Sequence, residues 1–259
     1  MSAGRLQGKV AVVTGSNSGI GRAIAIAYGG EGAIVICASR RPEAQEGDLP
    51  THEQIKKNGG KAEFHHLQFT ETESIDNLIK KVVKEHGRID VWVSNAGTIG
   101  TMKPVHELTD EEFDSTVDTN LKGCFRCLRS AAAQMQTQPL NDFSRRGSII
   151  SITSVFGPRG WPASAAYSAS KLGTVGMTTA AATDLSQHKI NVNCISPGTV
   201  MTKATDSMPP EIMQALGRKA LLGFGVPEDI SGPAILLASE EGRWIQGQQI
   251  FIDGGFTIT

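Results

Sequence analysis

The amino-acid sequence predicts an α/β fold built on one doubly wound sheet of about seven parallel strands, with helices on both faces. Short apolar runs without polar alternation recur along the chain, as is typical of strands buried on both faces. Helical patterns separate these runs, which indicates parallel βαβ units. No linker, repeat or shift in composition interrupts the 259 residues, so we expect residues 1–259 to form a single domain.

The expected elements alternate in the order that a Rossmann-type sheet requires. Strands are predicted at residues 10–13, 33–37, 61–68, 89–93, 148–152, 190–195 and 249–252. Longer helices are predicted at residues 19–29, 75–86, 111–136, 165–186 and 228–238. After a loop at residues 41–49, Thr51 and Gln54 have the spacing of a capping box, which predicts a short helix from Thr51 to Gly59 and Gly60.

Composition excludes several classes of protein. Lys and Arg number 25 against 26 for Asp and Glu, so the chain has no strongly basic footprint for a nucleic acid. No apolar run approaches the roughly 18 residues of a membrane-spanning helix. Four scattered cysteines and a first segment without a secretory pattern favour a reducing, cytoplasmic setting. Cys124 and Cys127 lack a second ligand pair, so we expect buried thiols and no metal site, and no histidine is assigned to catalysis.

A glycine-rich segment, Thr14-Gly15-Ser16-Asn17-Ser18-Gly19-Ile20-Gly21, lies between the first strand and the first helix. Glycines at such a turn let the pyrophosphate of a dinucleotide reach the N-terminus of the helix. A tight turn without a ligand is the alternative explanation. The residues predicted to bind the cofactor here are Gly15, Asn17, Ser18, Gly19, Ile20 and Gly21.

The second strand ends without the acidic residue that usually binds the adenosine ribose of NAD. Ser39, Arg40 and Arg41 follow instead. A hydroxyl and guanidinium groups suit a ribose 2′-phosphate, so the sequence favours NADP(H) over NAD(H). Either arginine could also be an ordinary solvated surface charge.

Tyr167 and Lys171 are four residues apart on a predicted helix and therefore share a face. An ammonium group beside a phenol stabilises the phenolate, which makes the phenol usable as a general acid and base.

These motifs together resemble the short-chain dehydrogenase/reductases, over residues 9–255. The family's motifs match the glycine-rich segment, Asn95-Ala96-Gly97, Asn120, Ser154, the Tyr167–Lys171 pair and the segment from Pro197 and Gly198 through Val200 to Thr202. The resemblance implies a carbonyl/alcohol oxidoreductase. In it, Tyr167 transfers a proton to the substrate oxygen, Ser154 hydrogen-bonds that oxygen, Lys171 binds the nicotinamide ribose, and Asn120 holds a water of a proton relay. Residues 95–97 and the segment from Pro197 to Thr202 are implied to contact the cofactor.

The resemblance also implies a substrate lid and an assembly. Residues 201–225 correspond to the mobile lid, and their apolar content suggests a fairly hydrophobic small-molecule carbonyl or alcohol. Gln68 stands where many members have an aspartate that contacts adenine, and it is predicted to bind the cofactor there because its amide can still accept a hydrogen bond. Residues 48–50 resemble a short insertion. Relatives are homotetramers or homodimers, so we expect a homo-oligomer packed through the helices at 111–136 and 165–186.

Two other functions stay open. One is a dehydratase, epimerase or cyclase on the same scaffold, and the other is a noncatalytic NADP-binding regulator, because a fold does not fix a function. Retention of Ser154, Tyr167 and Lys171 argues against the regulator.

Overall fold

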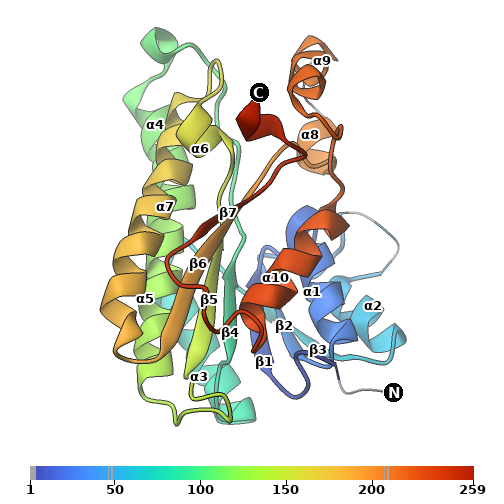
Figure 1. Ribbon diagram of the computed structural model, residues 1–259, viewed down its shortest axis with the longest axis vertical. Coiled ribbons are helices and arrows are strands. Elements are labelled where there is room, and N and C mark those ends of the chain that lie inside the picture. The colour runs from blue at the N-terminus through green and yellow to red at the C-terminus, as the bar shows by residue number, and fades with distance from the viewer. Residues whose placement is uncertain (1–3, 46, 48, 207, 209) are drawn as a thin grey trace.

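The computed structural model describes residues 4–259 except 46, 48, 207 and 209. Within that part of the chain, seven parallel strands form one sheet in the order β3-β2-β1-β4-β5-β6-β7 (Figure 1). The strands are β1 (Val10–Thr14), β2 (Ile34–Ser39), β3 (Lys61–His66), β4 (Val91–Ser94), β5 (Gly147–Ile152), β6 (Ile190–Pro197) and β7 (Gln249–Ile252). The predicted doubly wound sheet is therefore confirmed, including the weak strand at β3.

Helices cover both faces of the sheet. On one face lie α1 (Gly19–Gly30), α2 (Thr51–Lys57) and α10 (Ser231–Ala238), and on the other lie α3 (Thr72–His86), α5 (Gly123–Gln136) and α7 (Ala165–Ser186). The shorter elements are η1 (Val105–Glu107), α4 (Asp110–Val117), η2 (Asp118–Lys122), α6 (Phe156–Arg159), α8 (Lys203–Asp206), α9 (Pro210–Lys219), η3 (Pro227–Ile230) and η4 (Phe256–Ile258).

Strand alternation divides the core into two apolar layers. Val13 and Ile150 face the layer under α1 and α10, whereas Val12 and Ile149 face the layer under α3, α5 and α7. Tyr28 of α1 is fully buried in the first layer, and its hydroxyl donates a 2.9 Å hydrogen bond to the Ala234 carbonyl of α10. Burial raises the pKa of Tyr28, so this second tyrosine of the chain is a structural group.

Some sequence-based boundaries were wrong. Thr51 does not form the predicted capping box, because its hydroxyl donates to the Ser16 carbonyl at 2.6 Å and accepts from Arg22 at 2.9 Å. The helix predicted over residues 111–136 is interrupted by the π-helical turn η2, and the one predicted over 228–238 begins as the 3₁₀ turn η3. Of the predicted insertion at 48–50, residue 48 lies outside the described residues.

The topology places the candidate site. The strand order reverses between β1 and β4, and ligands of open parallel sheets bind beyond the carboxyl ends of the strands at that reversal.

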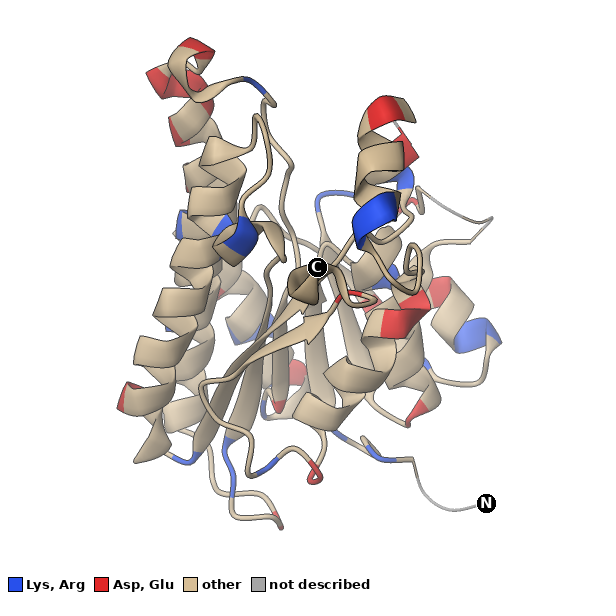
Figure 2. Ribbon diagram, turned by 45° about the horizontal axis from the view of Figure 1, so that its top comes forward, with Lys and Arg blue, Asp and Glu red and all other residues tan. Residues whose placement is uncertain are grey.

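Figure 2 shows acidic and basic positions interspersed over the helices and loops rather than segregated by sign. Over the described residues, no helix is long and apolar enough to cross a membrane.

Burial explains the state of the cysteines. Cys37, Cys124, Cys127 and Cys194 are all buried free thiols, as predicted for Cys124 and Cys127. Desolvation raises the pKa of each, to about 12 for Cys37 and about 11 for Cys194, which keeps them protonated and poor metal ligands.

Candidate active site

A cleft of about 1160 Å³ opens beyond the carboxyl ends of the strands. Its wall includes most of the residues predicted to bind a cofactor or to carry chemistry. Those predicted residues are Gly15, Asn17, Ser18, Gly19, Ile20, Ser39, Arg40, Arg41, Asn95, Ala96, Gly97, Ser154, Tyr167, Lys171, Pro197, Gly198, Val200 and Thr202. The fold thus brings segments from five strand ends into one site.

The glycine-rich turn needs its glycines for conformation and for space. Gly15 and Gly19 have φ values of 64° and 48°, in the left-handed region that side chains disfavour. A Cβ on Gly21 would lie 2.3 Å from Asn95 Nδ2 and 2.4 Å from the Gly15 carbonyl oxygen. Gly21 therefore packs the turn and does not line the cleft, while Ser18 at the N-cap of α1 makes no side-chain cap.

Thr14 joins the glycine-rich turn to the strand end beside it. Its hydroxyl oxygen accepts from the backbone N–H groups of Asn95 at 3.0 Å and Ala96 at 3.1 Å. The Asn95 side-chain amide donates back to the carbonyl oxygens of Thr14 at 3.0 Å and Gly15 at 3.3 Å. Asn95 therefore positions the floor of the cleft through hydrogen bonds to backbone.

The end of β2 presents two exposed arginines to the same cleft. Ser39 Oγ donates a 2.7 Å hydrogen bond to the Arg41 carbonyl and so fixes the turn that carries Arg40 and Arg41. The following loop is tied to the glycine-rich turn, because the N–H of Gln45 donates to the Asn17 carbonyl at 3.1 Å. The arrangement places guanidinium charge at one end of the cleft.

The side chains expected to carry chemistry meet at the other end. Lys171 is buried on α7, and its ammonium group donates to the Ile152 carbonyl at 3.0 Å and lies 5.6 Å from the centre of the Tyr167 ring. Ser154 follows β5, is 6% exposed, and accepts from the N–H of Phe156 at 3.1 Å. A phenol, a hydroxyl and an ammonium therefore line the same cleft.

Asn120 lies behind this wall, in the π-helical turn η2. Its amide donates to the Thr98 carbonyl at 2.8 Å and to Ser170 Oγ at 3.2 Å, while its Oδ1 accepts from the Thr98 N–H at 2.8 Å. A Cβ built on Gly97 would lie 3.0 Å from Asn120 Oδ1 and 3.6 Å from Lys171 Nζ, so the two side chains are neighbours. Asn120 does not itself line the cleft.

Aromatic and aliphatic side chains cover the Tyr167 end of the cleft. Phe156 stacks on Trp161 at 5.5 Å between ring centres and meets Phe256 edge-on at 5.8 Å. Side chains of the predicted lid join this cluster, and those described are Met208, Ile212, Met213, Leu216 and Phe224. Pro209, which the sequence also placed in the lid, lies outside the described residues, and Leu221 and Leu222 are exposed.

The sequence analysis missed two kinds of residue in the cleft. Some contribute through hydrogen bonds to or from the backbone, and others lie next to a residue that was predicted in their place. Leu67 and Phe69 line the cleft, whereas the predicted Gln68 does not, and its N–H donates to Ser74 Oγ at 3.0 Å. Thr14 could have been found, because it stands at a strand end. The carbonyl of Ile152 has no signature in a sequence.

Comparison with known proteins decides the family. The family model described as "Enoyl-(Acyl carrier protein) reductase" matches residues 15–257. The chain is 36% identical to 3-oxoacyl-[acyl-carrier-protein] reductase FabG of Thermotoga maritima, over 98% of this chain and all of the relative. It belongs to the short-chain dehydrogenase/reductase family.

Solved structures of this family share the fold closely. A short-chain type dehydrogenase/reductase from Mycobacterium marinum superposes with a TM-score of 0.90 at 32% identity, covering 98% of this chain and 97% of that one. A putative NAD(P) dependent gluconate 5-dehydrogenase from Beutenbergia cavernae, with bound NADP at low occupancy, gives 0.88 at 32% identity, with 98% of both chains covered. The chain therefore shares its fold with these proteins and belongs to a family of oxidoreductases.

Proposed function

We propose that this protein is an NADP(H)-dependent oxidoreductase that reduces the carbonyl group of a fairly hydrophobic small molecule to an alcohol. One observation carries the proposal: a single cleft unites the glycine-rich turn, two arginines and the Ser154, Tyr167 and Lys171 side chains. The polar groups lie along one wall, and the apolar cluster covers the end where Tyr167 stands.

The cleft fits a nicotinamide dinucleotide phosphate. Gly15 and Gly19 have positive φ angles that favour glycine, so no side chain projects from the turn at these positions. The N-terminus of α1 supplies N–H donors and the positive end of the helix dipole for a pyrophosphate. Arg40 and Arg41 suit the additional 2′-phosphate, and a relative with 32% identity binds NADP. The cofactor would supply hydride chemistry at its nicotinamide ring.

Residues of this chain would protonate and hydrogen-bond the carbonyl oxygen of the substrate. Tyr167 would donate its hydroxyl proton to that oxygen, which would complete the alcohol and leave the side chain as a phenolate. Ser154 donates a hydrogen bond to the same oxygen, and this contact strengthens as negative charge develops on it. Lys171, held by the Ile152 carbonyl, would stabilise the phenolate and hold the nicotinamide ribose of a bound cofactor, and Asn120 would support reprotonation through a water.

The apolar cluster supports a hydrophobic substrate. Phe156, Trp161, Met208 and Leu216 all line the cleft, and Met102 adds a further apolar surface. Burial of an uncharged aliphatic or aromatic ketone against these side chains contributes binding free energy of roughly 25 cal/mol per Å² of apolar surface removed from water.

The assembly and the setting are proposed as well. Exposed apolar side chains on α4, α5 and α7 support a homo-oligomer, and they include Phe113, Phe125 and Leu172. Four buried free thiols support a reducing compartment such as the cytoplasm. Light scattering of active protein at micromolar concentration should give a dimer or tetramer.

Turnover tests the reaction class. With NADPH and a panel of uncharged ketones, we expect net NADPH consumption and formation of the alcohol, and Tyr167→Phe should reduce kcat by about 10²- to 10⁴-fold. Tyr28→Phe, which removes a buried hydroxyl far from the cleft, is the matched control for the loss of a phenol. Product formation without net NADPH consumption would instead support the dehydratase, epimerase or cyclase function.

A further inference from the structure

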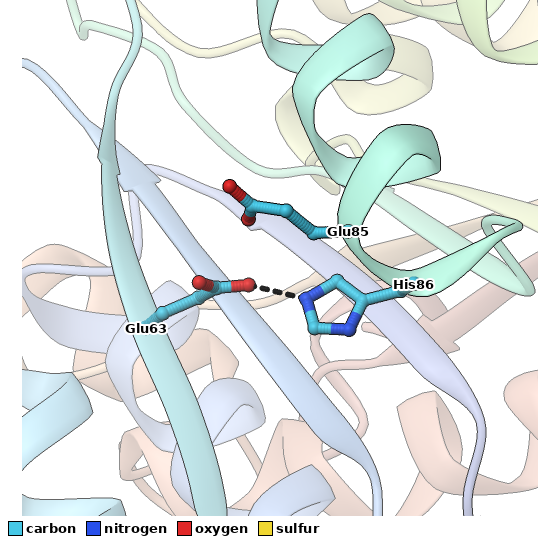
Figure 3. A group of neighbouring side chains, drawn as sticks. All are labelled: Glu63, Glu85 and His86. Atoms are coloured by element: carbon cyan, nitrogen blue, oxygen red, sulfur yellow. Dashed lines mark hydrogen bonds and ion pairs between the residues drawn. The ribbon is translucent and has the colours of Figure 1, made fainter.

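A cluster of imidazole and carboxylate groups lies outside the cleft, between β3 and the end of α3. Glu63 projects from the strand, and Glu85 and His86 are the last two residues of the helix (Figure 3). One ligand atom from each of the three lies within 4.8 Å of the others. His86 Nε2 and Glu63 Oε1 are 2.5 Å apart, so the strand and the helix are already joined at this point.

His65 adds a buried nitrogen beside the same carboxylate. Because Glu63 and His65 are two residues apart on β3, both face the layer under α3, opposite Ile36 and Ala38 of β2. The His65 side chain is only 5% exposed, and its Nε2 lies 3.4 Å from Glu63 Oε2. This nitrogen makes no hydrogen bond among the described residues, and the charged group nearest to it is the Glu63 carboxylate, so His65 supports that carboxylate from the buried side.

The local charges favour a cation. Glu63 and Glu85 bring two carboxylates together, and the C-terminus of α3 adds the negative end of the helix dipole. Gly87 ends the helix in the left-handed conformation, with φ of 82°. Glu85 is exposed and Glu63 and His86 are half-buried, so an ion can reach the cluster from solvent. Lys84, the other basic residue of that last turn, is exposed.

We propose that Glu63, Glu85 and His86 bind a divalent transition-metal ion such as Zn²⁺, while His65 lies against Glu63 and holds its carboxylate in place. Imidazole nitrogens with carboxylate oxygens suit zinc and its neighbours, whereas Mg²⁺ and Ca²⁺ prefer oxygen ligands alone. Ligand atoms about 2.1 Å from one zinc ion are roughly 3.4 Å apart, so small side-chain rotations convert the observed cluster into a coordination shell.

The site is separate from the proposed reaction. None of these four residues lines the cleft, and α3 runs back along the sheet so that its end lies toward the amino ends of the strands. The strand concerned, β3, is at the edge of the sheet and pairs only with β2. A bound ion would therefore tie this edge strand to α3 and stabilise the fold without touching the reacting groups.

Metal titration of the tag-free, full-length protein tests the proposal. We expect isothermal titration calorimetry with Zn²⁺ to give one site per chain, and Zn²⁺ at 100-fold excess over its Kd to raise Tm by about 5–10 °C. His86→Gln and Glu63→Gln should each weaken binding at least 10-fold, since each removes a ligand, and Mg²⁺ should give no comparable shift.

An exposed pair provides the matched control. His106 and Glu107 approach each other to 3.4 Å, but both side chains are exposed and stand outside the cluster. His106→Gln should therefore leave the zinc titration unchanged, and NADPH affinity should be the same in every variant. No saturable zinc binding, or binding that His86→Gln and Glu63→Gln leave intact, would overturn the proposal. If a substitution unfolds the protein, Glu85→Gln, on an exposed side chain, gives the same test without a buried change.

Discussion

The two ends of the cleft are built in different ways. The glycine-rich end is held by hydrogen bonds between backbone and short side chains, as when Thr14 accepts from two consecutive N–H groups. The lid end is held by contacts among large apolar side chains, such as the stacked Phe156 and Trp161 rings. Backbone hydrogen bonds restrict the first end to one geometry, whereas apolar packing tolerates exchange of one side chain for another of similar volume.

This difference explains what each end reveals about function. Residues that build the first end are restricted by space and by φ, so the proposed dinucleotide rests on their identity, and the proposed 2′-phosphate rests on the arginines beside them. The relatives with known names include an acyl-carrier-protein reductase and a putative gluconate dehydrogenase, so the same scaffold is associated with unlike substrates. The apolar end sets a substrate class rather than one molecule.

Removing the buried cation should give the largest effect. Lys171→Met keeps the length of the side chain and loses its charge, so kcat should fall by about 10²- to 10⁴-fold while NADPH affinity falls less. Steady-state kinetics and fluorescence titration measure the two quantities. The exposed Lys122→Met is the control. A loss of NADPH affinity with kcat unchanged at saturating NADPH would mean that Lys171 only binds the cofactor.

A methyl group in the glycine-rich turn should have the next largest effect. Gly21→Ala places a Cβ against Asn95 and the Gly15 carbonyl, so we expect a loss of about 1–3 kcal/mol in unfolding free energy and a clear loss of NADPH affinity. Gly30→Ala, in the same helix with no atom within 4 Å of the added Cβ, should leave NADPH affinity unchanged and should not lower the unfolding free energy. Denaturant unfolding with NADPH titration separates the two variants, and an intact NADPH site in Gly21→Ala would contradict the tight turn.

Substitution at the apolar end should have a smaller effect that depends on the substrate. Trp161→Ala removes one ring of the stacked cluster, so kcat/KM for a large hydrophobic ketone should fall by about 10- to 100-fold and that for a small ketone much less. Trp244, which is 90% exposed, provides the control variant Trp244→Ala. A uniform loss for large and small ketones would show that Trp161 supports the fold instead of the substrate.

The sequence predicted the strands because their apolar runs have to be buried on both faces. It also predicted the strand-end residues that meet in the cleft, since parallel strands bring their carboxyl ends to one edge. The sequence-based prediction was wrong for a hydroxyl group that could either cap its own helix or bind another segment. Thr51 has the spacing of a capping residue, but its hydroxyl instead joins α2 to the glycine-rich turn through the Ser16 carbonyl.

Other features depend on tertiary contacts that no local pattern contains. Asn120 lies in a π-helical turn, and its amide there hydrogen-bonds Thr98 and Ser170, which are distant in sequence. The cluster of Glu63 and His86 joins a strand to a helix end more than twenty residues later. The sequence therefore predicts no metal site. The proposed site rests on the contact between Glu63 and His86, which only the folded structure brings together.

The most direct test of the account is cofactor preference at the arginine end. Fluorescence titration of the purified protein should show tighter binding of NADPH than of NADH. Arg40→Ala should weaken NADPH binding by about 10- to 100-fold and leave NADH binding unchanged, because only NADPH carries the 2′-phosphate. Arg243→Ala, on an exposed residue outside the cleft, controls for the loss of one charge. Equal or stronger binding of NADH, or an Arg40→Ala variant with unchanged NADPH affinity, would contradict the proposed cofactor.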